Sequence, residues 1–187
     1  MLFEVLFSDK NKVEFLKNTT FLYLESSKIE GNYPLISLDY SHKEILSKGF
    51  CYFEKDDFCF GFISKKVKDI KKDSKKCYDK ILAKIKKNNP YRFWNFIPEI
   101  NKKINKNEVY KLFNIGRREA FISKYKGRYS KKLAAATGVD ILNDRLTIIF
   151  IAGKKKTRHL ENPNQIPPYK YPKKYGIKSP SFSRISS

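Results

Sequence analysis

The sequence predicts an α+β fold in which helices cover one face of a mixed sheet. Aromatic and β-branched runs of strand length are interleaved with two amphipathic helical stretches. Strands stand at both ends of this order, with a hairpin at each end, which favours helices gathered on one side of a sheet. Hydrophobic residues make up 41% of the 187 residues, enough for a packed core.

The first predicted strands lie in the N-terminal third. Residues 1–45 show no clean period, and only residues 20–24 form a plausible strand there. Residues 49–54 and 58–63 are aromatic-rich runs on either side of a short polar turn. That arrangement predicts a β-hairpin.

The first helix is expected after a lysine-rich connection over residues 65–76. Asp73 or Ser74 is expected to cap this helix, because both side chains accept hydrogen bonds from a first helical turn. The apolar residues between positions 77 and 85 recur at helical spacing. Residues 88–90, Asn-Asn-Pro, are predicted to end the helix.

The second half of the chain alternates strand and helix. Residues 91–96 are aromatic and alternating, which predicts a strand, and residues 107–125 form an amphipathic helix that Gly127 ends. Residues 133–139, rich in small side chains, and the apolar residues 145–152 are predicted to be the last two strands.

Residues 1–153 are predicted to form one domain, weakly defined over residues 1–45. Residues 154–187 hold five of the eight prolines and no long apolar run, so an extended segment is expected there. No apolar run reaches the about 18 residues of a membrane span, and no signal peptide is predicted. Three cysteines without metal spacing fit a reducing cytoplasm, which is the predicted location.

The charge is unevenly distributed. Residues 1–64 hold 7 Lys and Arg against 10 Asp and Glu, whereas residues 65–187 hold 33 against 9. A basic half attracts anions, and the candidates are nucleic acid and small anionic metabolites. No phosphate-binding loop, dinucleotide motif or metal-ligand spacing is present, so neither a cofactor nor a metal is predicted.

Four stretches carry a family resemblance. They are residues 91–101 (YRFWNFIPEIN), 116–120 (GRREA), 134–139 (AAATGV) and 161–184 (ENPNQIPPYKYPKKYGIKSPSFSR). In this order they resemble the chorismatases, which hydrolyse chorismate to pyruvate and a hydroxybenzoate or a dihydroxycyclohexadiene carboxylate. The resemblance implies a RidA-like (chorismate-mutase-like) sheet with helices on one face.

The resemblance also implies that this chain corresponds to the N-terminal half of such an enzyme. In the family a second RidA-like half carries the glutamate that donates the proton, so no catalytic residue is expected in this chain. A truncated gene product, a fragment and one part of a split enzyme all remain open. A second chain or self-association would complete the site, and the chain alone is expected to be weakly active or inactive.

Chorismate is the implied partner, and its two carboxylates and ring hydroxyl call for charged and neutral hydrogen-bond donors. Arg184 is the predicted carboxylate fork, and Arg117 is interpreted as a structural ion pair. The predicted substrate-binding residues are Arg184, Tyr171, Tyr169, Gln165, Thr137 and Gly138.

Two other readings stay open. The basic half and its interleaved aromatic residues would also suit a RidA-like module that binds RNA or another polyanion. Scattered lysines and the lack of an RNA-binding motif make nucleic acid the less favoured partner, and no membrane partner is predicted. The third reading is a non-functional remnant with an exposed sheet face, which would aggregate or oligomerise.

Overall fold

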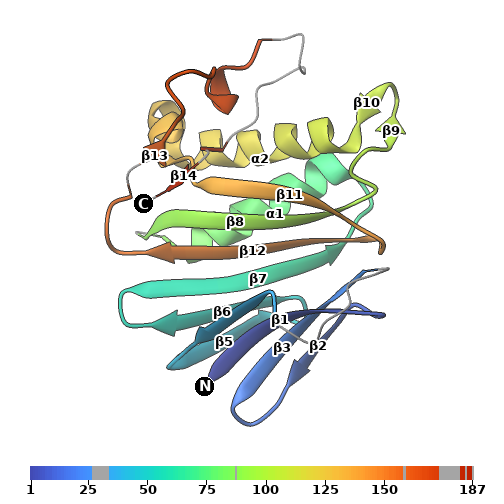
Figure 1. Ribbon diagram of the computed structural model, residues 1–187, viewed down its shortest axis with the longest axis vertical. Helices are drawn as coiled ribbons and strands as arrows, with labels where there is room; N and C mark the ends of the chain where they lie inside the picture. Colours follow the sequence, from blue (N-terminus) through green and yellow to red (C-terminus); the bar gives the residue numbers. More distant parts are fainter. Residues whose placement is uncertain (27–33, 87, 158, 173–181, 184, 187) are drawn as a thin grey trace.

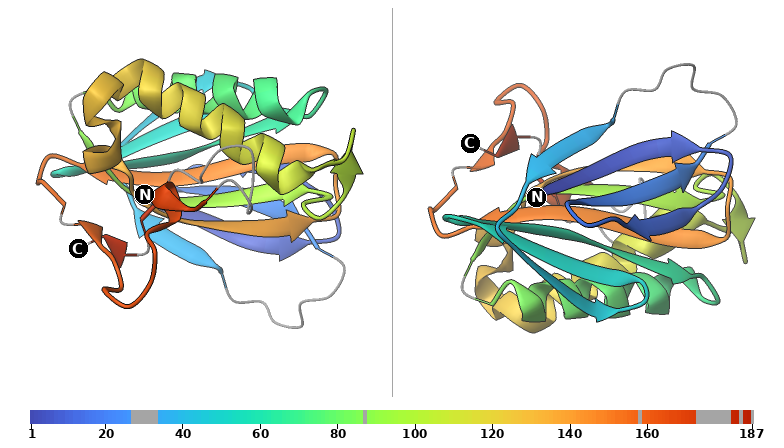
Figure 2. Two further views of the ribbon diagram at one scale, coloured as in Figure 1. Left: turned by 90° about the horizontal axis from the view of Figure 1, so that it is seen from above. Right: turned by 90° about the horizontal axis from the view of Figure 1, so that it is seen from below.

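The computed structural model describes residues 1–26, 34–86, 88–157, 159–172, 182–183 and 185–186. These residues form three layers, seen edge-on in Figure 2. A pair of helices covers one face of a six-stranded sheet, and a four-stranded sheet packs on the opposite face (Figure 1). The predicted mixed sheet with helices on one face is confirmed.

The six-stranded sheet is the centre of the fold. Its outermost pair, β11 and β8, is parallel, and every other neighbouring pair is antiparallel. In spatial order the strands are β11 (Ala135–Ile141), β8 (Asn89–Pro98), β12 (Arg145–Gly153), β7 (Phe58–Lys66), β6 (Phe50–Lys55) and β5 (His42–Ser47). The predicted hairpin of aromatic runs is β6–β7. The strands predicted at residues 133–139 and 145–152 are β11 and β12, but they do not form a hairpin, because β8 lies between them.

Helices α1 (Ile70–Lys84) and α2 (Val109–Tyr125) lie side by side on this sheet. Their buried faces meet the same side of the strands in one apolar core, which includes Phe93 and Phe150. A helical stripe of apolar residues is expected to bury in this way because its members fall on one face. Among the described residues, no helix is long and apolar enough to cross a membrane.

The second sheet is absent from the sequence-based prediction. It has the order β2 (Lys12–Phe15), β3 (Thr19–Glu25), β1 (Leu2–Ser8) and β4 (Ile36–Asp39), with β1 and β3 parallel. The Phe3 ring stacks on the Phe53 ring at 4.8 Å between centroids. Only residues 20–24 had been expected there, because both faces of β1 and β3 carry apolar side chains and hide the period of two.

The start of α1 differs from the prediction. Asp69, not Asp73 or Ser74, is the N-cap, and its carboxylate accepts the backbone N–H of Lys72. Asp73 lies within the first turn and accepts the backbone N–H groups of Lys68 and Asp69. The helix therefore begins at Ile70, within the connection predicted over residues 65–76. Asp73 does not cap the helix; it connects the preceding loop to the first helical turn.

The end of α2 also differs. Lys126, not Gly127, has the left-handed backbone, with φ of 50°, and it is the C-cap. A short 3-10 helix, η1 (Lys126–Lys132), follows directly. The remaining short elements are β9 (Lys103–Ile104), β10 (Asn107–Glu108), β13 (His159–Leu160), η2 (Pro168–Lys170) and β14 (Ile185–Ser186).

Candidate functional site

The crossing of the two helices places the first site residue. Gly116 of α2 lies so close to α1 that an added Cβ would stand 2.1 Å from the Lys71 carbonyl oxygen and 2.2 Å from Ser74 Oγ. The Ser74 hydroxyl donates to the Phe113 carbonyl at 3.1 Å and ties the helices together at this point. The next residue, Arg117, is therefore held at a fixed depth beneath the helix layer.

Arg117 is a buried cation surrounded by aromatic rings. Its side chain is 1% exposed, and its guanidinium carbon lies 5.1 Å from the ring centroid of Tyr78 and 5.5 Å from those of Phe93 and Phe121. Its Nε and Nη2 have no hydrogen-bond partner among the described residues. The expected structural ion pair is not found there, since no carboxylate of the described chain pairs with Arg117.

A buried cation of this kind is unusual. Burial lowers the pKa of the Arg117 guanidinium, but an arginine still carries its charge at neutral pH. Two buried N–H groups without acceptors leave a desolvation cost that a bound anion would remove. Cation–π contacts offset part of that cost and hold the guanidinium plane in place. The arrangement is suited to receiving a carboxylate.

A small pocket lies beside Arg117. It is lined by residues of β8, α2, β11 and the C-terminal segment, namely Asn95, Tyr110, Phe113, Asn114, Arg117, Ala136, Thr137, Gly138 and Phe182. The cavity measures about 10 Å³, room for about one water molecule. Thr137 Oγ1 is also buried without a hydrogen-bond partner among the described residues. A cation and a hydroxyl, both without a hydrogen-bond partner among the described residues, thus line one pocket.

The C-terminal segment closes this pocket. The Ser183 backbone N–H donates to the Ala134 carbonyl at 3.2 Å, and Ser183 forms a parallel bridge with Ala135 on the outer edge of β11. Phe182 is thereby placed against the pocket. A ligand larger than one water molecule exceeds the volume of this pocket, so lining side chains would have to move to admit it.

The predicted site residues divide into two groups. Thr137 and Gly138 both line the pocket. Tyr169 is half-buried and packs against the helix-side core, Tyr171 is half-buried, and Gln165 is exposed in a turn after Asn162. Arg184 lies outside the described residues.

Sequence reasoning missed Arg117 as a site residue. A partial signal was present in Gly116, since a glycine within a helix often marks a point where another element packs closely, and Arg117 is its neighbour. The ring cage could not have been foreseen, because its three aromatic residues come from α1, β8 and α2.

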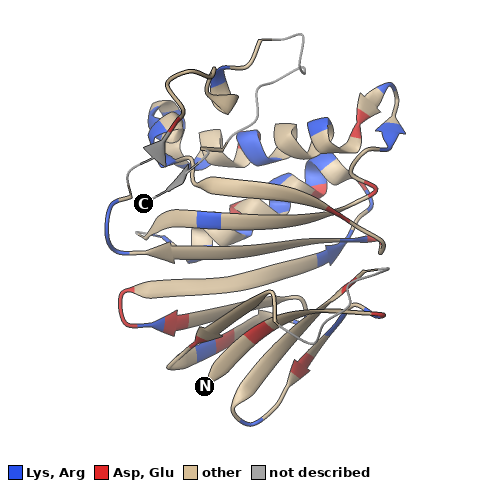
Figure 3. Ribbon diagram, viewed as in Figure 1, with Lys and Arg blue, Asp and Glu red and all other residues tan. Residues whose placement is uncertain are grey.

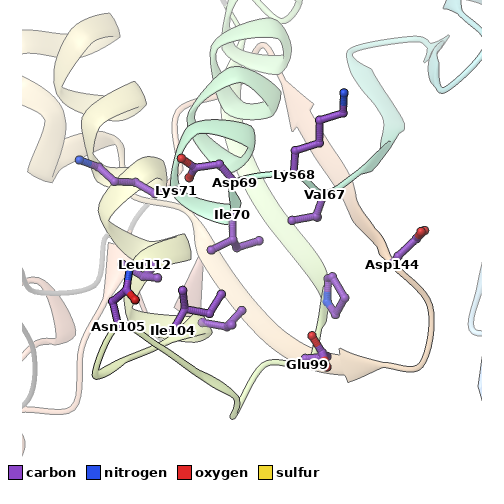
Figure 4. Close-up of a pocket in the computed structure, with 12 residues that line it drawn as sticks. Val67, Lys68, Asp69, Ile70, Lys71, Glu99, Ile104, Asn105, Leu112 and Asp144 are labelled. Atoms are coloured by element: carbon purple, nitrogen blue, oxygen red, sulfur yellow. The ribbon is translucent and has the colours of Figure 1, made fainter.

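A larger cavity of about 480 Å³ lies elsewhere, at the N-terminal ends of α1 and α2 (Figure 4). Its floor is apolar and includes Ile70 and Leu112. Most charged side chains that line it, though not Lys68, form ion pairs with described residues outside the cavity, as in Asp69–Lys72 and Lys71–Glu119. It therefore offers no unsatisfied charge comparable to that of Arg117.

The basic residues of the second half gather on the helix layer, as Figure 3 shows. Some of these lysines form ion pairs; Lys65 pairs with the buried Asp73, and Lys75 pairs with the partly exposed Asp79. Basic residues still outnumber acidic ones in this half by 33 to 9, so the surface keeps a net positive charge, and exposed pairs contribute little to stability. Among the described residues, no group of three or more His, Cys, Asp or Glu side chains could hold a metal ion.

Comparison with known proteins identifies the family. The family model described as "Chorismatase FkbO/Hyg5-like, N-terminal" matches residues 37–152. The chain belongs to the FkbO/Hyg5-like chorismatase family. A solved chorismatase structure matches with a TM-score of 0.83 and 19% identity, covering 99% of this chain and 57% of that chain. This second likeness supports the fold.

Two curated relatives of this family are similar in sequence. The 3-hydroxybenzoate synthase of Streptomyces hygroscopicus is 37% identical over 98 residues, which are 51% of this chain and 28% of that protein. The chorismatase of Streptomyces rapamycinicus is 36% identical over 97 residues, with the same two shares. The chain thus spans little more than half of the solved chorismatase, and its match covers about a quarter of each curated relative.

The pocket brings together the four stretches that carry the family resemblance. Asn95 comes from residues 91–101, Arg117 from residues 116–120, Thr137 from residues 134–139, and Phe182 from the C-terminal segment. These stretches are far apart in the sequence and meet at one place in the fold.

Proposed function

We propose that this chain binds chorismate in the Arg117 pocket and contributes that binding site to chorismate hydrolysis. The observation that carries the proposal is the buried guanidinium, unpaired among the described residues, in a pocket where all four family-like stretches meet. The names of the two curated relatives support a substrate of this class. The expected products are pyruvate and a hydroxybenzoate or a dihydroxycyclohexadiene carboxylate.

The chemistry of the pocket suits one carboxylate of chorismate. The free N–H groups of Arg117 would donate to the two carboxylate oxygens, and charge-assisted hydrogen bonds of this kind are about twice as strong as neutral ones. The Thr137 hydroxyl would donate to a further oxygen. The phenyl ring of Phe182 would form an apolar wall for the ring of the substrate after moving aside.

Hydrolysis needs a second component. The enol ether carbon must be protonated before water attacks the resulting cation. The described residues that line the pocket include no Asp or Glu. We infer that the acid comes from outside the described residues, supplied by a further part of the protein, a second chain or a second copy. The isolated chain is accordingly proposed to bind chorismate more readily than it hydrolyses it.

The test compares two neighbouring arginines. Arg117→Met removes the buried cation and keeps an apolar side chain, whereas Arg118→Met removes a half-buried arginine whose guanidinium lies over the Tyr129 ring. Chorismate affinity is measured by calorimetry, and pyruvate release is followed in the same samples. Arg117→Met should weaken binding at least tenfold, while Arg118→Met should not change it. Equal effects of the two substitutions would refute the proposed site.

A further inference from the structure

Asn95 links a helix to the edge strand of the site. Its side-chain Oδ1 accepts the Tyr78 hydroxyl proton at 2.6 Å, and its Nδ2 donates to the Thr137 carbonyl at 2.8 Å. Tyr78 lies on α1, Asn95 on β8 and Thr137 on β11, so two hydrogen bonds connect three elements. Tyr78 is 0% exposed and Asn95 is 1% exposed, so solvent has little access to these hydrogen bonds.

The two hydrogen bonds fix the orientation of the Asn95 amide. The Thr137 carbonyl can only accept, so the amide nitrogen must face it and the amide oxygen must face Tyr78. A flipped amide would set two oxygens against each other. Burial strengthens both bonds and raises the pKa of Tyr78 to about 12, which keeps its hydroxyl protonated.

Tyr78 also supports the cation. Its ring centroid lies 5.1 Å from the guanidinium carbon of Arg117, the shortest of the three ring distances. The hydroxyl of Tyr78 is thus connected through Asn95 to the backbone of the edge strand, while the ring of the same residue packs against the guanidinium of Arg117. One side chain therefore contacts the guanidinium directly and Thr137 through a single intermediate residue.

We propose that Tyr78 and Asn95 are positioning residues of the anion pocket. They hold the Arg117 guanidinium and the Thr137 segment of β11 at the separation that a carboxylate requires. The ligand part of this inference rests on the proposed function, whereas the positioning part concerns the free protein. Small misplacements of charged donors weaken binding strongly, because hydrogen-bond strength falls steeply with geometry.

The test removes one hydroxyl from each of two buried tyrosines. Tyr78→Phe keeps the ring beneath Arg117 and deletes the hydrogen bond to Asn95. Tyr125→Phe is the matched control, because the Tyr125 hydroxyl is buried on the same core without a hydrogen-bond partner among the described residues. Both variants lose the same atom from one core, so any difference reports the hydrogen bond.

Two readouts separate positioning from general stability. The first is the Arg117 Nε–H resonance of nitrogen-15-labelled protein without ligand. It should shift or broaden in Tyr78→Phe and stay unchanged in Tyr125→Phe. The second is chorismate affinity of the folded protein, which should fall about tenfold in Tyr78→Phe only.

Asn95→Asp extends the test by placing a carboxylate in the pocket that Arg117 lines. The new charge would pair with the guanidinium and repel both the Thr137 carbonyl and an incoming carboxylate, so the loss of affinity should exceed that of Tyr78→Phe. An unshifted Arg117 resonance in Tyr78→Phe, or an equal affinity in the two tyrosine variants, would overturn the positioning role. If the unaltered protein binds no chorismate, the proposed function fails, and the ligand-free resonances still decide the positioning role.

Discussion

The close helix crossing at Gly116 allows a quantitative prediction for Gly116→Ala. The added methyl group would stand 2.1 Å from the Lys71 carbonyl oxygen and 2.2 Å from Ser74 Oγ, more than 1 Å inside the 3.4 Å at which ordinary contact begins. One of these neighbours is backbone and cannot rotate away, so the helices must separate. Forcing a methyl group into a packed interior costs about 1–3 kcal/mol, and this case lies at the upper end.

Part of that cost is offset, because alanine favours a helix over glycine by about 1 kcal/mol. We therefore expect a net loss of about 2 kcal/mol in the free energy of unfolding, equivalent to a fall of about 4–8 °C in Tm for a chain of this size. Chorismate affinity should fall as well, since Arg117 follows Gly116 and moves with the helix. Urea unfolding followed by circular dichroism measures the first effect, and calorimetry measures the second.

Gly127→Ala is the control. An added Cβ at Gly127 meets nothing within 4 Å, so this substitution should leave stability and affinity unchanged. If Gly116→Ala were as stable as Gly127→Ala, the helices would not be in the close contact that the structure shows, and the reasoning that places Arg117 by this crossing would be refuted.

Three further predictions test other parts of the fold. Asp73→Asn should cost about 2 kcal/mol of stability. Burial alone raises the pKa of the Asp73 carboxyl, but hydrogen bonds from Lys65 and the backbone hold that pKa below its usual value. The stabilisation is therefore present above the unfolded pKa and lost as pH falls through the folded one, so acid unfolding of the variant should depend less steeply on pH. Burial raises the pKa of Tyr78 and Tyr125 to about 12 from an unfolded value of about 10. The folded state therefore retains protons that the unfolded state releases. Between about pH 10 and 12 the free energy of unfolding should fall by up to about 1.4 kcal/mol per pH unit for each tyrosine. Urea unfolding at several pH values measures this slope, which should be smaller in Tyr125→Phe. Thr137→Val should raise the Tm slightly, because the Thr137 hydroxyl has no described partner, yet weaken chorismate binding; unchanged affinity would remove Thr137 from the site.

The sequence determined most of the helix-and-strand order after residue 49. The aromatic hairpin, α2 and β12 were predicted because their patterns are local: alternation for strands, a four-residue spacing for helices and a buried apolar run for β12. The family was also determined by sequence, since its four patterned stretches can be read without knowing where they lie in space.

The tertiary structure decided the N-terminal sheet. In β1 and β3 the outward positions, such as Leu2 and Tyr23, are apolar too, so the pattern does not distinguish the buried face. β1 and β3 pair in parallel, and the strand that lies between them in the sequence, β2, pairs with the other side of β3. Only packing against the aromatic face of the central sheet determines which side of these strands is buried.

The tertiary structure also decided the site. From sequence, Arg117 was one arginine of a basic helix, and an ion pair was the ordinary expectation for such a residue. In the fold, aromatic rings from three elements surround its guanidinium. The pocket beside it is lined by Asn95 and Phe182, which are more than 80 positions apart in the sequence. Burial and missing partners are properties of the surroundings rather than of the residue, so they become visible only once the chain has folded around it.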